Sequence, residues 1–220
     1  MKWILVLALV LSGLPKMAVA QTVSEDTSAP DMTYLTEEEK VARDVYQAFA
    51  KKYSKRVFEN IARSEQHHLE KMSDLLTTCD KDIPRAVRKD KPGRFDSPEL
   101  QELYQSLVAR GEKSLEDALR VGALIEETDI LDLRAAAAGA ECEEATQLYV
   151  RLEKASYNHL RAFVRNLDKQ GVTYEPVLLA QEDYTDILSQ EKFRGEGHGK
   201  GNGHSGGKGH GKNQHKKHGG

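Results

Sequence analysis

Cysteine is scarce in this sequence, and it contains neither long apolar runs nor strand-like alternation. Only two cysteines occur in 220 residues, and without a Cys-x-x-Cys pair they do not form a familiar redox or zinc motif. No apolar run approaches the roughly 20 residues that a membrane-spanning helix needs. Between residue 35 and about residue 187, no convincing alternation of apolar and polar residues predicts a strand. These absences predict an all-α protein without a membrane span.

The first twenty residues, MKWILVLALVLSGLPKMAVA, form a segment of a different kind. A basic residue, Lys2, precedes an apolar run from Trp3 to Leu11, and the small residues AVA stand before Gln21. A basic start, a short apolar core and a small-x-small end are typical of a secretory signal peptide. We therefore expect residues 1–20 to be removed and the mature protein to be exported, to the periplasm or the extracellular space.

Charge divides the remaining chain into an acidic body and a basic tail. Residues 21–190 contain 23 basic and 33 acidic residues, a net charge of −10, whereas residues 191–220 contain seven basic and two acidic ones. An acidic body argues against a specific nucleic-acid ligand and suits the binding of cations. The tail is rich in glycine, histidine and lysine and has almost nothing to bury, so we expect it to be disordered. Its imidazoles are weak candidate ligands for Ni, Cu or Zn: His198, His204, His210, His215 and His218.

Helical periodicity runs through residues 33–190, which we expect to form one domain after a flexible lead-in at residues 21–32. Four long helices and one short helix are predicted. The first long helix starts at Thr36, with Glu39 as its capping-box partner, and the second spans about 57–77. The short helix spans about 97–110, the third long helix starts near Ser114, and the fourth spans about 143–170.

The connections between these helices predict how they pack. Short loops join the first two long helices and the last two, whereas a long crossover bearing the short helix separates the pairs. Short loops produce antiparallel hairpins, and the crossover makes the second and third long helices parallel, as in a ferritin-like four-helix bundle. Cys79 and Cys142 would then lie at the same end of the bundle. In an oxidising compartment we expect these two cysteines to form a disulfide.

A bundle of this topology suggests where a metal centre would lie. Dimetal-carboxylate bundles use one Glu from each of two helices and a Glu-x-x-His from each of the other two. The helix at 57–77 contains Glu65 and His68, which lie three residues apart and therefore on one face. His67 points about 100° away from His68 and is expected at the surface or beside the ligands.

The first and third long helices should each contribute one glutamate, and we identify it from the residues that share its helix face. In the first long helix we favour Glu39, with Glu38 as a rival on a neighbouring stripe. In the third long helix we favour Glu126, because Glu127 aligns with two arginines and is expected to face solvent.

The last long helix lacks a second Glu-x-x-His. His159 is the candidate ligand there, but Ser156 stands three residues before it, where a glutamate is expected. Glu153 lies one turn further back and is an uncertain substitute, and Asn158 is a weaker one.

Two further residues are candidate neighbours of the ligands. Tyr46 is either a partner of a ligand or a core aromatic residue. Asp129 is either the acceptor for an imidazole N–H, which ligating histidines usually need, or a surface residue. Ser156 is counted with them because of its position before His159.

Four blocks of the sequence resemble the DUF2202 family of ferritin-like proteins. They occur in order between about Leu35 and Ile187: LTEEEKVARDVYQAF, SEQHHLEKM, SLEDALRVGALIEETDILDL and SYNHLRAFVRNL. The resemblance implies a ferritin-like fold and a metal site, and a serine before the histidine of the last helix is usual in the family. The biochemical role of the family is undefined, so the resemblance implies no particular activity.

These patterns lead to one preferred function and two alternatives. We expect an exported protein with a di-iron or mononuclear site, with manganese as the other metal, bound by Glu39, Glu65, His68, Glu126 and His159. As an enzyme it would react with O2 or peroxide as an oxidase, peroxidase or ferroxidase. The alternatives are a non-enzymatic metal-binding protein that uses both bundle and tail, and a metal-free structural bundle. A homodimer is the one protein partner that we keep open.

Overall fold

The computed structural model of the chain describes residues 30–140 and 142–190, and within them every regular element is a helix. The all-α prediction is therefore confirmed for this part of the chain. No helix among these residues is long and apolar enough to cross a membrane. Seven α-helices are described: α3 (Met32–Tyr53), α4 (Arg56–Thr78), α5 (Arg85–Lys89), α6 (Pro98–Gly111), α7 (Leu115–Gly139), α8 (Glu143–Asp168) and α9 (Gln181–Ser189).

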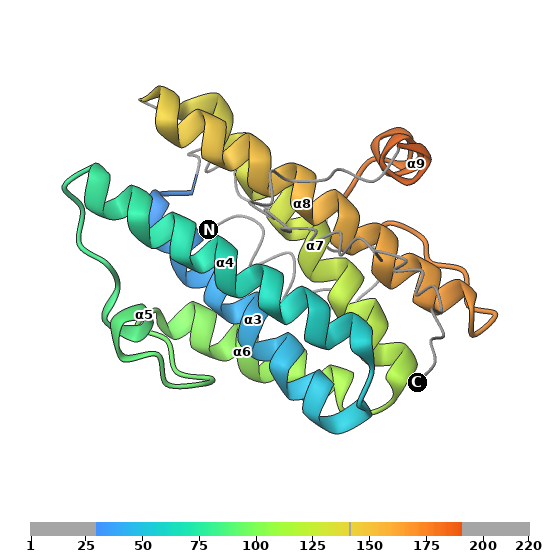
Figure 1. Cartoon of the computed structure of the whole chain (residues 1–220). Coiled ribbons are helices and arrows are strands. Elements are labelled where there is room, and N and C mark those ends of the chain that lie inside the picture. The colour runs from blue at the N-terminus through green and yellow to red at the C-terminus, as the bar shows by residue number, and fades with distance from the viewer. Residues whose placement is uncertain (1–29, 141, 191–220) are drawn as a thin grey trace, which may run out of the picture.

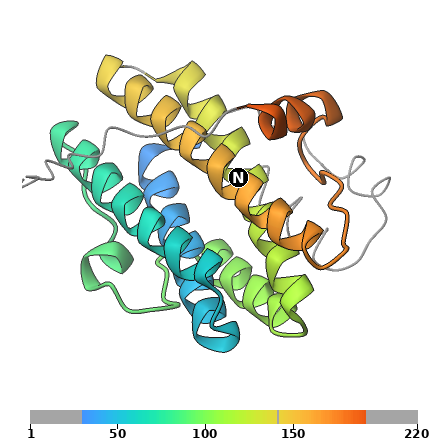
Figure 2. The same cartoon turned by 45° about the vertical axis from the view of Figure 1, so that its right-hand side comes forward.

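The four long helices pair as two hairpins, α3 with α4 and α7 with α8 (Figure 1). A two-residue turn joins α3 to α4, and its Ser54 adopts a left-handed conformation with φ of 51°. The long crossover between α4 and α7 carries α5 and α6 along one side of the bundle. Figure 2 shows α9 outside the four long helices, where it contacts α8. This order and pairing are those that the connection lengths predict.

Helix α3 begins four residues before the predicted start. The side chain of Asp31 caps it by accepting hydrogen bonds from the N–H groups of Thr33 (2.6 Å) and Tyr34 (3.1 Å). Thr36 lies inside the helix, and its hydroxyl donates to the carbonyl of Met32 at 2.7 Å. The predicted capping box is therefore wrong, because Asp31 is a strong N-cap that allows the helix to start earlier.

Two apolar clusters fill the bundle, and the candidate ligands lie between them along the helices. One cluster includes Phe58 on α4 and Phe163 on α8, and the other includes Met72 on α4 and Leu152 on α8. Gly122 on α7 permits close packing beside the first cluster, because a Cβ atom there would lie 2.5 Å from the ring of Phe163. The polar site is thus enclosed by apolar packing above and below it.

A buried ionic network attaches the crossover to α3. Lys40 is fully buried, and its ammonium donates to Asp44 Oδ2 at 2.6 Å and to the carbonyl of Lys91 at 2.9 Å. Asp44 also accepts from Arg43 at 2.8 Å and from the N–H of Gly93 at 2.8 Å. These contacts join the crossover to the helix that carries Glu39.

The segment after α8 covers α7 and accounts for Glu127, which the sequence wrongly places in solvent. Glu127 is fully buried and accepts a hydrogen bond from the hydroxyl of Tyr174 at 2.6 Å. It also accepts from three successive backbone N–H groups, those of Val177 (2.9 Å), Leu178 (2.6 Å) and Leu179 (2.8 Å). The arginine stripe on α7 did not reveal this cover, because it comes from a segment about 50 residues away.

Candidate metal centre

The structure brings five predicted ligands together from all four long helices. Each is buried, with at most 8% of its surface exposed. The five are Glu39 on α3, Glu65 and His68 on α4, Glu126 on α7 and His159 on α8.

Glu65 lies at the middle of the cluster and faces both histidines. Its Oε2 atom is 2.6 Å from His68 Nδ1, and its Oε1 atom is 2.8 Å from His159 Nδ1. Glu39 Oε2 lies 3.3 Å from His68 Nδ1, and Glu126 Oε2 lies 3.3 Å from His159 Nδ1. The result is two groups of three residues that share Glu65, and within each group the ligand atoms lie within 4.8 Å of one another.

Several of these atoms converge without forming hydrogen bonds. His159 Nδ1 and Glu65 Oε1 are only 2.8 Å apart, yet both are buried without a hydrogen-bond partner, as are Glu39 Oε2 and Glu126 Oε2. A buried polar atom left unpaired costs about 1–3 kcal/mol. Carboxylate and imidazole donors that converge on shared points suit a transition-metal ion. These residues therefore fit a metal-binding function.

Ser64 connects the two histidines on the side away from the carboxylates. Its Oγ atom is 3.0 Å from His159 Nε2 and 3.4 Å from His68 Nε2. The two rings stack at a centroid distance of 5.5 Å with an angle of 23° between their planes. A hydroxyl that holds both Nε2 atoms leaves both Nδ1 atoms directed toward the carboxylates. The sequence offers one signal for Ser64, its position one turn before His68, but that position does not reveal the contact with His159 on another helix.

Tyr46 contacts a candidate ligand directly. It is fully buried, and its hydroxyl donates to Glu126 Oε1 at 2.6 Å and to the carbonyl of Gly122 at 3.3 Å. One oxygen of Glu126 is therefore held by Tyr46, while the other faces His159.

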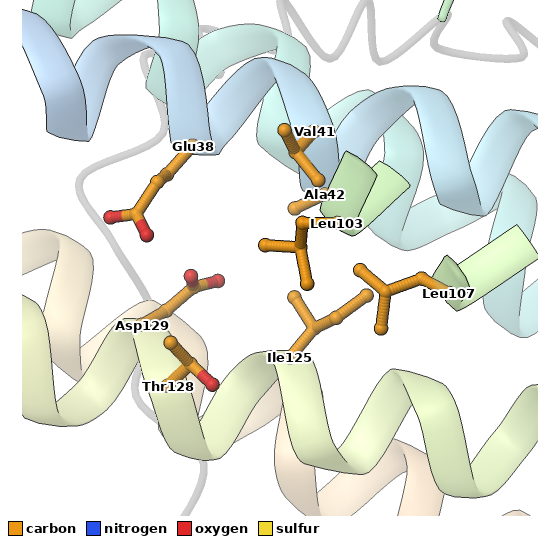
Figure 3. A pocket seen from close by; sticks show the side chains of 8 residues that line it. All are labelled: Glu38, Val41, Ala42, Leu103, Leu107, Ile125, Thr128 and Asp129. Atoms are coloured by element: carbon orange, nitrogen blue, oxygen red, sulfur yellow. The ribbon is translucent and has the colours of Figure 1, made fainter. Parts of the chain in front are cut away.

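Asp129 does not accept an imidazole N–H, because Ser64 occupies that position for both rings. Its side chain instead lines a small pocket with Glu38, the rival of Glu39 (Figure 3). The prediction of Asp129 as an imidazole acceptor is therefore wrong.

Glu153 is not part of the centre. It forms an ion pair with Arg134 at 3.0 Å and accepts a hydrogen bond from Tyr157, so α7 and α8 hold it away from the other ligands. Ser156 is buried and donates to the carbonyl of Leu152 within its own helix at 3.3 Å. Asn158 accepts a hydrogen bond from Arg161 at 2.6 Å. Helix α8 therefore contributes a histidine to the cluster but no carboxylate.

His67 differs sharply from its neighbour His68. Its side chain is 77% exposed and lies 3.3 Å from Glu70, which is also exposed. Only one of the two adjacent histidines therefore faces the cluster.

Burial and charge act against each other within the cluster. Burial raises the pKa of Glu39 to about 7 and also raises the pKa of Glu126, although the facing imidazoles oppose both shifts. Burial would raise the pKa of Glu65 as well, but His159 and His68 hold it well below its usual value. For His159, burial is outweighed by the facing carboxylates, which raise its pKa to about 10. A metal ion bound by these imidazoles would compete with the protons that the facing carboxylates favour on them.

The two cysteines are free thiols in this structure, so the predicted disulfide is not formed in it. They do lie close together, as the bundle topology requires. Burial is the main cause that raises the pKa of the Cys79 thiol, and a hydrogen-bond contact with Cys142 raises it further. Their pairing stays a prediction.

Several sequence-based predictions fall outside the described residues. These are the signal peptide at 1–20, most of the lead-in at 21–32 and the histidine-rich tail at 191–220. Export and metal binding by the tail therefore stay predictions.

Comparison with known proteins supports the relationship that the sequence blocks suggest. Residues 28–191 match the family described as "Uncharacterized protein domain (DUF2202)". The "Uncharacterized protein MJ0754" of Methanocaldococcus jannaschii is 40% identical over 185 residues, which cover 84% of this chain and 96% of that protein. The crystal structure of hypothetical protein MJ0754 from Methanococcus jannaschii matches with a TM-score of 0.71 and 41% identity, over 74% of this chain and 91% of that one. This chain therefore belongs to the DUF2202 family.

Proposed function

We propose that this protein is an exported, ferritin-like metal-binding protein whose bundle holds two metal ions at the carboxylate–histidine centre. Iron is the proposed metal, with manganese as the alternative, and the proposed activity is oxidation chemistry with O2 or peroxide. The position of Glu65 carries this proposal: each of its oxygens faces a different histidine, and each histidine faces a further glutamate.

The ligand set divides naturally between two ions. Glu39 and His68 would hold one, Glu126 and His159 the other, and Glu65 would bridge them. When bound, iron would supply one-electron exchange with O2 or peroxide. Carboxylate and imidazole ligands suit iron and manganese better than the thiolate-selecting metals.

The protein's own groups prepare this ligand set. The hydroxyl of Tyr46 holds one oxygen of Glu126, which leaves the other available at the centre. Ser64 fixes the orientation of both imidazoles through their Nε2 atoms. Outer partners of this kind typically contribute 10–100-fold to metal affinity or activity. The apolar clusters on either side limit the access of water to the ligands.

A second function, metal storage without catalysis, is favoured by one observation. Ser156 stands where a dimetal site would have a second Glu-x-x-His, so the two ions would share a single bridging carboxylate. Fewer anionic ligands would bind a cation less tightly. In this alternative the centre would buffer metal, and the histidines of the tail would collect it.

Metal analysis of untagged, full-length protein separates these functions, with Glu65→Gln as the test variant. The matched control is Glu70→Gln, since Glu70 lies on the same helix with 56% of its side chain exposed. We expect about two irons per chain in the wild type and in the control, and loss of most of this iron in Glu65→Gln. Consumption of peroxide or O2 that is lost only in Glu65→Gln supports the enzyme.

Each contrary result identifies an alternative. Metal retention without consumption of oxidant supports storage. Equal metal content in Glu65→Gln and the wild type contradicts the centre, and if that metal disappears from a chain ending at residue 190, it belongs to the tail. A stable wild-type protein that binds no metal supports the structural alternative.

A further inference from the structure

The two hairpins of the bundle meet along two seams, and another helix covers only one of them. Helix α6 packs against both α3 and α7 and covers the seam between these two helices. On the other side α4 contacts α8 directly (Figures 1 and 2), and no further helix in the described part of the chain packs against both. Among the described residues, the α4–α8 seam is therefore the one without helical cover.

The candidate ligands nearest to solvent lie at this seam. The side chains of His68 on α4 and His159 on α8 are each 10% exposed, whereas those of the three glutamates are 0–6% exposed. The two imidazole rings stack, and the hydroxyl of half-buried Ser64 lies between their Nε2 atoms. An ion that arrives along the seam therefore meets imidazole groups first and the carboxylates behind them.

The chain also carries imidazoles in the segment that follows α9. Arg161 on α8 donates a hydrogen bond to the carbonyl of Ile187 in α9 at 2.6 Å, and Arg161 is only two residues from His159. Residues 191–220 begin directly after this helix and contain five of the eight histidines. The tail therefore starts from a helix that is held by a residue within one helical turn of His159.

The length and charge of the tail suit a contact with the α4–α8 seam. A flexible, glycine-rich chain of 30 residues has a root-mean-square length of about 30 Å, whereas a helix with its side chains is about 10–12 Å wide. The tail is thus long enough to pass around α8 from α9. Its seven basic and two acidic residues complement the net charge of −10 on residues 21–190.

We propose that residues 191–220 deliver divalent metal ions to the centre across the α4–α8 seam, an inference that rests on the metal-binding function proposed above. The histidines of the tail bind an ion from solution and pass it to His68 and His159, one imidazole replacing another. The ion keeps its oxidation state, and each imidazole of the tail leaves as the neutral base. The tail then determines how fast the centre is loaded, whether the centre stores metal or catalyses a reaction.

The ligands on the two sides of the seam give this transfer a direction. The tail offers neutral imidazoles in water, whereas the centre adds three buried carboxylates, and opposite charges attract more strongly away from water. Tethering gives the transfer its speed. A short flexible linker produces an effective concentration of the order of millimolar, so an ion held by the tail is presented to the centre far more often than a micromolar ion in solution.

The test is the rate at which one equivalent of Co²⁺ loads the centre of full-length, untagged protein. The visible absorbance that Glu65→Gln lacks reports on Co²⁺ in the centre. In the test variant all five histidines of the tail are changed: His198→Gln, His204→Gln, His210→Gln, His215→Gln and His218→Gln. With micromolar protein, this variant should load about tenfold more slowly or worse and reach the same final absorbance, because it loses the tethered ion.

The matched control keeps the histidines and removes five positive charges from the tail: Lys200→Gln, Lys208→Gln, Lys212→Gln, Lys216→Gln and Lys217→Gln. It should load within about threefold of the wild-type rate, because attraction between exposed charges is screened by salt. Dilution provides a second readout. Transfer within one chain has a rate that does not change on dilution, whereas loading of the histidine-free tail variant should slow in proportion to the dilution.

A variant of the seam tests the route. Ala155 lies one turn before His159 on the same face of α8 and is half-buried. Ala155→Trp should slow loading without lowering the final absorbance, because the larger side chain covers the approach to His159. Ala138→Trp, at an exposed position near the end of α7, should load at the wild-type rate.

Three results would overturn the inference: equal loading rates with and without the histidines of the tail, a wild-type rate that falls in proportion to dilution, or unchanged loading in Ala155→Trp. Each of these leaves the final absorbance intact, so the proposed metal centre stands. Absence of the Glu65-dependent absorbance from every chain contradicts the centre itself and the delivery of metal to it.

Discussion

Single side chains at the edge of the carboxylate–histidine cluster decide how its candidate ligands are oriented. Ser64 is the clearest case, because one hydroxyl lies within 3.0–3.4 Å of Nε2 on histidines from two helices. Tyr46 likewise orients Glu126, because its hydroxyl donates a hydrogen bond to one of the two carboxylate oxygens. Neither residue belongs to the proposed ligand set, yet each determines which atoms of the ligands face inward.

Substitution of Ser64 by alanine should therefore weaken metal binding without unfolding the bundle. We expect the affinity for iron or manganese at the centre to fall about tenfold, because both imidazoles lose the group that orients them. Metal titration with a melting curve for each protein measures this. The control is Ser73→Ala, whose hydroxyl bonds only to the carbonyl of Leu69 on the same helix. Equal losses in the two variants would contradict an orienting role.

The burial of Asp132 leads to a prediction about the stability of the metal-free protein. Burial raises its pKa from 3.8 to about 7. Between these values the folded state binds more protons than the unfolded state, so stability falls as pH rises and levels off above about pH 7. Three units correspond to about 4 kcal/mol. Asp132→Asn should remove up to this penalty at pH 8, and less than half of it at pH 5.

Chemical denaturation at the two pH values, with a chelator present, measures the effect of Asp132→Asn. Asp74→Asn is the control, because the Asp74 side chain is 72% exposed. If the gain in stability from Asp132→Asn is the same at both pH values, the pKa of Asp132 is not raised.

At the scale of elements, buried polar contacts attach the outer segments to the four long helices. The crossover is held to α3 through Lys40 and Asp44, and the segment after α8 is held to α7 through Glu127. Apolar packing alone would allow these irregular segments to shift. Hydrogen bonds to their backbone give each segment one position.

Glu127→Ala should release the segment at residues 172–180 from α7. Three backbone N–H groups, on Val177, Leu178 and Leu179, would lose their acceptor, and each unpaired group costs about 1–3 kcal/mol. We expect a loss of about 3 kcal/mol in unfolding free energy, moderated by water that reaches the exposed groups. Hydrogen exchange should accelerate most at these three amides. Glu116→Ala, which removes a half-exposed ion pair with Arg120, should change stability by less than about 1 kcal/mol.

On the scale of the whole molecule, two hairpins meet around one polar layer, and the cysteines lie at one end of both. Cys79 follows α4 and Cys142 precedes α8. A bond between them would link the ends of the two hairpins. The same pairing also closes the long crossover and α7 into a single loop.

Protein recovered from an oxidising compartment should contain this disulfide. In the chain-entropy model a loop of this length is stabilised by about 4 kcal/mol. Intact-mass measurement should show the loss of two hydrogens, which reductant restores, together with a lower melting temperature after reduction. Cys142→Ser should melt like the reduced protein. Two free thiols in protein recovered from that compartment would show that the neighbouring cysteines stay unpaired.

The sequence by itself determined the four long helices, their order and the five candidate ligands that the structure brings together, whereas the short helices α5 and α9 were not predicted. The predicted features follow from local rules: Glu65 and His68 share a face because they are three residues apart, and a two-residue turn makes α3 and α4 antiparallel. The start of α3 does not follow from these rules: the spacing of Thr36 and Glu39 predicts a capping box, but Asp31 caps the helix instead.

Only the tertiary structure decided the contacts that join distant segments. Arg134 on α7 holds Glu153 away from the centre, a segment about 50 residues away buries Glu127, and Ser64 reaches a histidine 95 positions further along the chain. Helical periodicity reports which residues share a face, but it does not report what covers that face. The covering partner depends on how the hairpins and the crossover pack together, and that packing also left Glu38 and Asp129 facing each other.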